Sequence, residues 1–133
     1  MNYFLDTNTC VYYLKGSYPL IDRRLRLTSH QRIKIPSTVK AELLYGAQKS
    51  IRRDKVLASL EKFLFPFEVV PFGDACADHY AQIRADIERN GHPIGANDLI
   101  IAAIVRADGG VLVTHNVDEF SRVKGLAIQD WTA

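Results

Sequence analysis

The N-terminal stretch Met1-Asn2-Tyr3-Phe4-Leu5-Asp6-Thr7-Asn8 indicates how the rest of the chain is organised. Its apolar run, Tyr3-Phe4-Leu5, predicts a short buried strand, and the run stops at a carboxylate, Asp6. In open α/β sheets, ligands bind in the crevice at the carboxyl ends of the strands. Asp6 is therefore a candidate site residue, although an aspartate here also suits the N-cap of a following helix.

Beyond this stretch, short apolar runs alternate with helical patterns, which predicts an α/β fold. We expect three layers, with a central, mainly parallel sheet of four to five strands and helices on both faces. The expected strands are 3–5, 33–36, 67–70, 111–113 and 126–128, and the expected helices include 9–14, 37–50, 56–64 and 74–89.

Length and composition suit one folded domain over residues 1–133, since 47% of the 133 residues are hydrophobic. No apolar run is long enough to cross a membrane, and the N-terminus lacks the pattern of a secretion signal, which predicts a cytoplasmic protein. Cys10 and Cys76 show no metal-ligand spacing, so we expect two buried thiols.

Glu42 belongs to the helical pattern over 37–50, whose apolar stripe contains Val39 and Leu43. Its place beside that stripe predicts partial burial, which is costly for a carboxylate without a partner. The alternative is that Glu42 turns outward and pairs with a base such as Lys49.

Asp98 lies in the first turn of the apolar segment 97–105, which predicts a buried helix that ends at Gly109-Gly110. The helix macrodipole favours an anion in the first turn, so a capping role for Asp98 stands beside a role in a site.

The predicted strand 111–113 runs into the polar and acidic loop Thr114-His115-Asn116-Val117-Asp118-Glu119-Phe120. Polar groups thus follow a buried strand here, as they do at Asp6. Because the carboxyl ends of parallel strands lie at one edge of a sheet, we expect Asp6, Glu42 and Asp98 to meet beside this loop.

Grouped carboxylates need a counter-charge. Two of them about 5 Å apart repel by roughly 3 kcal/mol at an effective dielectric constant of 20, so three or four require protons or a cation. Oxygen ligands without His or Cys suit Mg²⁺ or Mn²⁺. Since Mg²⁺ keeps several waters, we expect one or two acids to bind it directly and the others, Glu42 among them, through water.

The formal net charge of +2 hides an uneven distribution. If Asp6, Glu42, Asp98 and Asp118 form one site, the rest of the surface carries about +6 at neutral pH. An acidic metal pocket on a basic body predicts metal-assisted hydrolysis of a phosphodiester, with a carboxylate accepting the proton of the attacking water.

A basic cluster surrounds the predicted helix that starts at Pro19, and it includes Arg23, Arg24 and Arg26. A solvated helix face is one interpretation of this cluster. The other is a surface that contacts the phosphates of RNA.

Five motifs are spread over the whole chain: Phe4-Leu5-Asp6-Thr7-Asn8, Lys40-Ala41-Glu42-Leu43-Leu44-Tyr45-Gly46-Ala47, Pro93-Ile94-Gly95-Ala96-Asn97-Asp98-Leu99-Ile100-Ile101-Ala102-Ala103, Val113-Thr114-His115-Asn116-Val117-Asp118-Glu119-Phe120-Ser121-Arg122-Val123 and Ile128-Gln129-Asp130-Trp131. Their order and spacing resemble those of the PIN-domain ribonucleases. More narrowly, they are similar to the VapC toxins of bacterial toxin–antitoxin pairs.

The resemblance implies a PIN fold and a Mg²⁺-dependent endoribonuclease that forms homodimers and is inhibited by a VapB-type antitoxin. It also suggests a structured RNA substrate. The enteric-type members, which this chain looks most like, cut initiator tRNA in its anticodon loop.

The resemblance assigns Asp6, Glu42 and Asp98 to the catalytic and metal-binding site. The hydroxyls of Thr7 and Thr114 are expected to fix Asp6 or a ligand water.

The fourth site position departs from the family pattern. Many members have an acid two residues after the equivalent of Thr114, and this chain has Asn116 there. Asn116 can still orient a water, and Asp118, two residues further along, is expected to supply the missing carboxylate.

Two other functions compete with a nuclease. A phosphotransferase of the haloacid-dehalogenase type also has an aspartate after its first strand, but it needs a second acid where Asn8 stands. The other alternative is a non-catalytic module that binds RNA or protein through its basic face.

Overall fold

The computed structural model describes all 133 residues and contains one parallel sheet with the strand order β3-β2-β1-β4-β5. The strands are β1 (Tyr3–Leu5), β2 (Ile33–Pro36), β3 (Glu68–Val70), β4 (Val111–Val113) and β5 (Ala127–Gln129). The α/β class and the five parallel strands are thus confirmed. Strand β5 begins one residue later than predicted because Leu126 still belongs to the preceding turn, where its N–H donates to the carbonyl of Val123.

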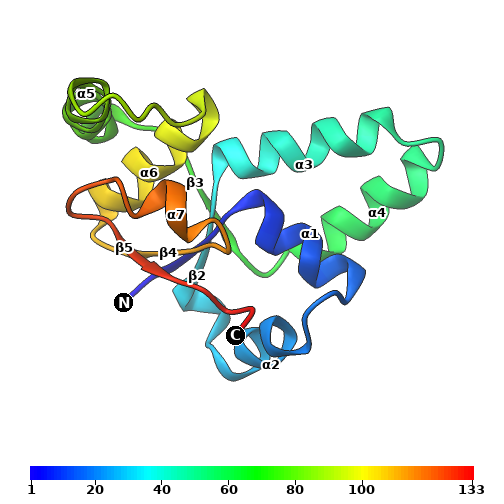
Figure 1. Cartoon of the computed structure of the whole chain (residues 1–133). Coiled ribbons are helices and arrows are strands. Elements are labelled where there is room, and N and C mark those ends of the chain that lie inside the picture. Colours follow the sequence, from blue (N-terminus) through cyan, green and yellow to red (C-terminus); the bar gives the residue numbers. More distant parts are fainter.

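Seven α-helices and one 3₁₀ helix connect the strands: α1 (Thr7–Lys15), α2 (Pro19–Leu27), η1 (His30–Arg32), α3 (Ser37–Lys49), α4 (Arg53–Leu64), α5 (Asp74–Arg89), α6 (Ala96–Asp108) and α7 (Val117–Phe120). Helices α5 and α6 lie on one side of the sheet and α2 on the other, while α3 and α4 form a long hairpin that extends to one side (Figure 1). None of the helices is long and apolar enough to span a membrane.

The central strands and α6 form the core. Strands β1 and β4 are buried on both faces, as their uninterrupted apolar sequences require in a parallel sheet. Helix α6 is buried along most of its length because it packs against α5 and against the sheet. The thiols of Cys10 and Cys76 are free and buried, as predicted.

Gly110 allows β4 to start close to β1. A Cβ atom at this position would lie 2.8 Å from the carbonyl oxygen of Asn2 and 2.8 Å from the ring of Phe4. Both neighbours are fixed in the core, so only glycine fits here.

Strand β1 marks the point where the strand order reverses. From β1 the chain continues to β2 on one side, and later returns to β4 on the other. The backbone N–H of Asp6 donates to the carbonyl of Val113 at 3.1 Å, so Asp6 and Thr114 leave the sheet side by side. Such a switch point, at the carboxyl ends of the strands, is where open α/β sheets form their ligand crevices.

Candidate active site

Asp6 is buried in this crevice, with 5% of its surface exposed. Its Oδ1 accepts a hydrogen bond from the backbone N–H of Thr9 at 2.8 Å, and its Oδ2 accepts one from the hydroxyl of Thr114 at 2.6 Å. Asp6 is therefore the N-cap of α1 and also a crevice residue, so the two interpretations of the sequence hold together.

The burial of Asp6 raises its pKa above the ordinary value. The hydrogen bonds from Thr114 and Thr9 oppose this rise, and the nearby charge of Glu42 adds to it. The carboxylate thus lies in an environment that disfavours its charge, and a cation would relieve that cost.

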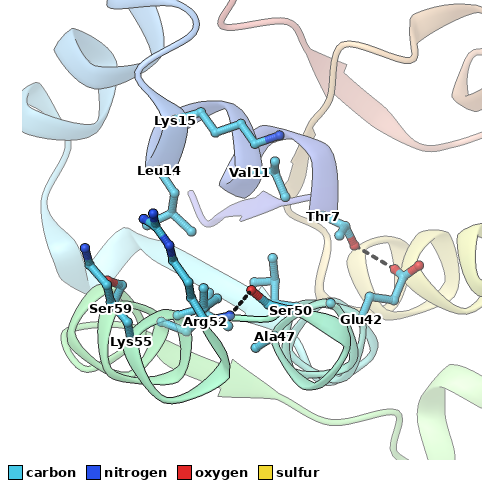
Figure 2. Close-up of a pocket in the computed structure, with 14 residues that line it drawn as sticks. Thr7, Val11, Leu14, Lys15, Glu42, Ala47, Ser50, Arg52, Lys55 and Ser59 are labelled. Carbon is cyan, nitrogen blue, oxygen red and sulfur yellow. Dashed lines mark hydrogen bonds between the residues drawn. The ribbon is translucent and has the colours of Figure 1, made fainter.

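Glu42 projects from α3 towards the start of α1. Its Oε1 accepts a hydrogen bond of 2.6 Å from the hydroxyl of Thr7, which Figure 2 shows at one end of a cleft. Lys49 does not pair with it, because its Nζ lies over the ring of Tyr45 at 4.4 Å. Thr7 therefore fixes Glu42 itself, rather than Asp6 as the sequence analysis allowed.

Asp98 lies in the first turn of α6, where no side chain caps the helix. The pKa of Asp98 is raised to about 7 by burial, by a hydrogen bond with Glu119 and by the charges of Glu119, Glu42 and Asp6. The charges of Glu42 and Asp6 both act on Asp98, so the structure brings the three predicted acids into one region.

Glu119 is the acid that the sequence analysis missed. Its Oε1 accepts from the backbone N–H of Gly95 at 3.1 Å, and its Oε2 accepts from the Nδ2 of Asn116 at 2.7 Å. Although burial raises its pKa, the hydrogen bonds from Asp98, Gly95 and Asn116, together with Arg122, hold the pKa of Glu119 below its ordinary value. The two carboxyls of this pair thus have pKa values shifted in opposite directions, that of Asp98 upwards and that of Glu119 downwards.

Asp118 lies elsewhere. Its side chain is exposed on α7, and its only recorded hydrogen bond is from the Ser121 hydroxyl to its backbone carbonyl. The reason is the short helix α7: residues three apart share a helix face, so Glu119 returns to Asn116 while Asp118 points away. The spacing Asn-x-x-Glu, close to that of a capping box, was the available signal in the sequence.

The hydroxyl of Thr114 links Asp6 to Asn116. It donates to Asp6 and accepts from the backbone N–H of Asn116 at 2.9 Å. Asn116 in turn holds Glu119 through its side chain. Asn116 therefore orients the fourth acid instead of replacing it.

Two of the three arginines of α2 have partners within the chain. Arg24 donates to the Oε1 of Gln129 at 3.1 Å and lies over the ring of Trp131, while Arg26 pairs with Asp22 at 3.1 Å. Contact between RNA and the set Arg23, Arg24 and Arg26 stays a prediction.

The replacement of Thr7 by valine tests the hydrogen bond to Glu42. Valine keeps the shape but removes the hydroxyl, so we expect kcat for RNA cleavage to fall about tenfold, as is usual when the partner of a site carboxylate is lost. Steady-state kinetics would measure it, with Thr7→Ser as the matched control. If Thr7→Val and Thr7→Ser cleave equally well, the hydroxyl has no role in positioning Glu42.

Comparisons with known proteins identify the family. The PIN domain family model matches residues 3–126. A protein of Salmonella typhimurium named "tRNA(fMet)-specific endonuclease VapC" is 39% identical over 131 residues, which cover 98% of both chains. The "Ribonuclease VapC2" of Rickettsia felis is 37% identical over 132 residues, again 98% of both.

Solved structures agree with this assignment. The fold matches a VapBC2 structure from Rickettsia felis bound to a promoter DNA fragment, with a TM-score of 0.92 and 36% identity over 98% of this chain and 99% of that one. It also matches a DNA-bound VapBC structure from Salmonella typhimurium, with a TM-score of 0.93 and 39% identity over 98% of each chain. The chain belongs to the PIN-domain family of VapC ribonucleases, the nuclease toxins of VapBC toxin–antitoxin pairs.

Proposed function

We propose that this chain is a Mg²⁺- or Mn²⁺-dependent endoribonuclease whose metal is held by Asp6 and Asp98, with Glu42 and Glu119 acting beside them. The observation that carries the proposal is the convergence of Asp6, Glu42, Asp98 and Glu119 on one crevice, where burial and the neighbouring carboxylates raise the pKa of Asp98 to about 7.

The donor set fits a hard divalent cation. All four side chains offer carboxylate oxygens only, with no Cys or His among them. As they stand, no three His, Cys, Asp or Glu side chains are arranged to hold a metal ion together. A site with one or two direct carboxylates and several waters agrees better with this arrangement than a complete cage of protein ligands. Asp118 is the weakest candidate ligand, because its side chain is exposed.

The protein groups have separable tasks in this proposal. A bound Mg²⁺ supplies a counter-charge for the phosphate and lowers the pKa of the attacking water. Asp6 is held rigidly from both oxygens, which fixes one corner of the site. Glu42 has one oxygen occupied by Thr7 and the other free to accept the proton of the attacking water. Asp98 from α6 and Glu119 from α7 line the other side of the site.

The name of the Salmonella typhimurium relative supports initiator tRNA as the substrate, since that protein is called specific for tRNA(fMet). The VapBC structures support a VapB-like antitoxin as the partner that holds the toxin inactive. In this proposal the protein acts in the cytoplasm, and the homodimer expected from the family resemblance forms part of it.

The experiment is to map cleaved RNA ends in cells after the induction of this chain or of Asp6→Ala. We expect new ends in the anticodon loop of initiator tRNA with the wild-type chain and none with the variant. Purified protein should give the same ends with Mg²⁺ and none in EDTA. Full cleavage in EDTA would refute the role of the metal, and ends in other RNAs alone would refute the tRNA substrate.

A further inference from the structure

A cleft of about 700 Å³ runs from the acidic site along α1, α3 and α4. Thr7 and Glu42 line one end of it (Figure 2). The cleft is also lined by three cations: Lys15 from α1, Arg52 from the turn before α4 and Lys55 from α4 itself. The active site therefore continues into a second surface of opposite charge.

These three cations, here called the basic arm, have no acidic partner in the protein. The side chains of Lys15, Arg52 and Lys55 make no ion pair and no hydrogen bond, unlike Lys34, which pairs with Glu68 at 2.6 Å. Glu42 is the only acid that lines the cleft, and it is already bonded to Thr7. Three unpaired cations around one cleft create a positive potential that attracts a polyanion.

The basic arm borders the acidic site along α1. Lys15 follows Thr7 by eight residues on α1, which corresponds to about 12 Å along the helix axis. A phosphate held by the basic arm is therefore a neighbour of the reacting phosphate along the strand. Figure 2 shows the side chain of Arg52 extending from its turn towards α1.

The floor of the cleft is apolar and includes Val11, Leu14, Val56 and Leu60. Grooves for single-stranded nucleic acid combine a cationic rim that follows the backbone with apolar surfaces that take the faces of bases. The positive charge of the basic arm also offsets the repulsion between the RNA phosphates and the four acids of the site. Charge and continuity with the active site both favour RNA as the occupant.

We propose that Lys15, Arg52 and Lys55 bind the phosphates that flank the scissile bond on one side and thereby hold the RNA strand in the active site. The inference rests on the proposed ribonuclease function and adds to it the path of the substrate and the residues that fix it. These are binding residues, so their loss is expected to act on KM and on affinity more than on kcat.

The test measures how the affinity for a fluorescent single-stranded RNA changes with salt, in EDTA so that no cleavage occurs. Each lost phosphate contact lowers the slope of log K against log salt by about 0.7 for a single strand. The triple variant Lys15→Gln/Arg52→Gln/Lys55→Gln should therefore lower the slope by about 2. The single variant Arg52→Gln should lower it by about 0.7.

The matched control removes the same charge from a different surface. Arg84, Arg89 and Lys124 are exposed cations paired with Glu88 or Asp86, and none of them lines this cleft. Their triple Gln variant should keep the wild-type slope. Equal losses in the two triple variants would show an effect of net charge alone and overturn the proposal, and so would an unchanged slope in the variant of the basic arm.

Further measurements distinguish a failure of this inference from a failure of the proposed function. If wild-type protein with Mg²⁺ cleaves RNA while the variant of the basic arm keeps the wild-type KM, only the inference fails. If wild-type protein cleaves no RNA, the proposed function fails first. A variant that keeps its RNA affinity but no longer binds the antitoxin would assign the basic arm to an acidic protein segment, which also overturns the inference.

Discussion

Replacement of Asp98 by asparagine is expected to abolish RNA cleavage and, in the same protein, to raise the melting temperature measured at pH 8 without metal. Asparagine keeps the size of the side chain but removes the charge that would bind Mg²⁺, so cleavage should fall by about 10³-fold or more. Stability should rise because the lost charge is one that Glu119, Glu42, Asp6 and burial all disfavour.

The pH dependence follows from the direction of the shift. The pKa of Asp98 is about 7 in the folded protein and 3.8 ordinarily, so the folded state binds the proton more tightly. The stability that this proton contributes is complete below about pH 4 and is lost as the pH rises through about 7. The lowered pKa of Glu119 acts in the opposite sense, but only at acidic pH, where that carboxyl begins to take up a proton.

Thermal melts of the metal-free wild type and of Asp98→Asn, from pH 5 to pH 8, would measure the effect. We expect the variant to melt about 5 °C higher at pH 8, because a half-buried group realises only part of the roughly 1.4 kcal/mol that each pKa unit represents. The difference should be smaller at pH 5, where only part of the contribution of this proton has been lost. Mg²⁺ should raise the melting temperature of the wild type more than that of the variant. A variant that melts at a lower temperature than the wild type at pH 8 would show that the ionised carboxylate of Asp98 does not destabilise the fold.

Replacement of Glu119 by glutamine is expected to lower kcat about 100-fold, whereas Asp118→Asn should stay within about twofold of the wild type. Glu119 lies against Asp98 and accepts from Gly95 and Asn116, so its loss releases the wall of the site opposite Asp6. The carboxylate of Asp118 has no hydrogen bond or ion pair to lose. Each change removes one negative charge at neighbouring positions, so net charge is matched between the two variants.

Single-turnover cleavage of one RNA by both variants would measure this difference. Similar losses in the two would restore Asp118 as a site residue. Wild-type rates for Glu119→Gln would mean that Asp98 needs no partner on α7.

The fold was largely predictable because its central elements have unambiguous patterns. Strands β1 and β4 are uninterrupted apolar runs, and each ends at a polar residue that points to the crevice, Asp6 or Thr114. The helix over 37–50 was predicted one residue longer than α3, since a fraying end leaves little trace in the sequence.

The site was less predictable where a single helical turn decides the direction of a side chain. Asp118 and Glu119 are adjacent acids, and only the start of α7 at Val117 determines which of them faces Asp98. The partner of Glu42 was equally hard to predict. The apolar stripe of its helix shows which face carries Glu42, but the hydroxyl that binds it belongs to Thr7, 35 residues away. Long-range partners of this kind follow from packing and not from local spacing.

The order of the strands also controls when the active site can exist. Asp6 is translated 108 residues before Thr114, whose hydroxyl holds it. At a synthesis rate of about 5–20 residues per second, this separation corresponds to a delay of roughly 5–20 s. Until β4 leaves the ribosome, β1 lacks one of its two neighbours, and Glu119 is not yet available to Asp98. A nascent chain therefore lacks the assembled acidic site until β4 and α7 have both been synthesised and have folded onto β1 and α6.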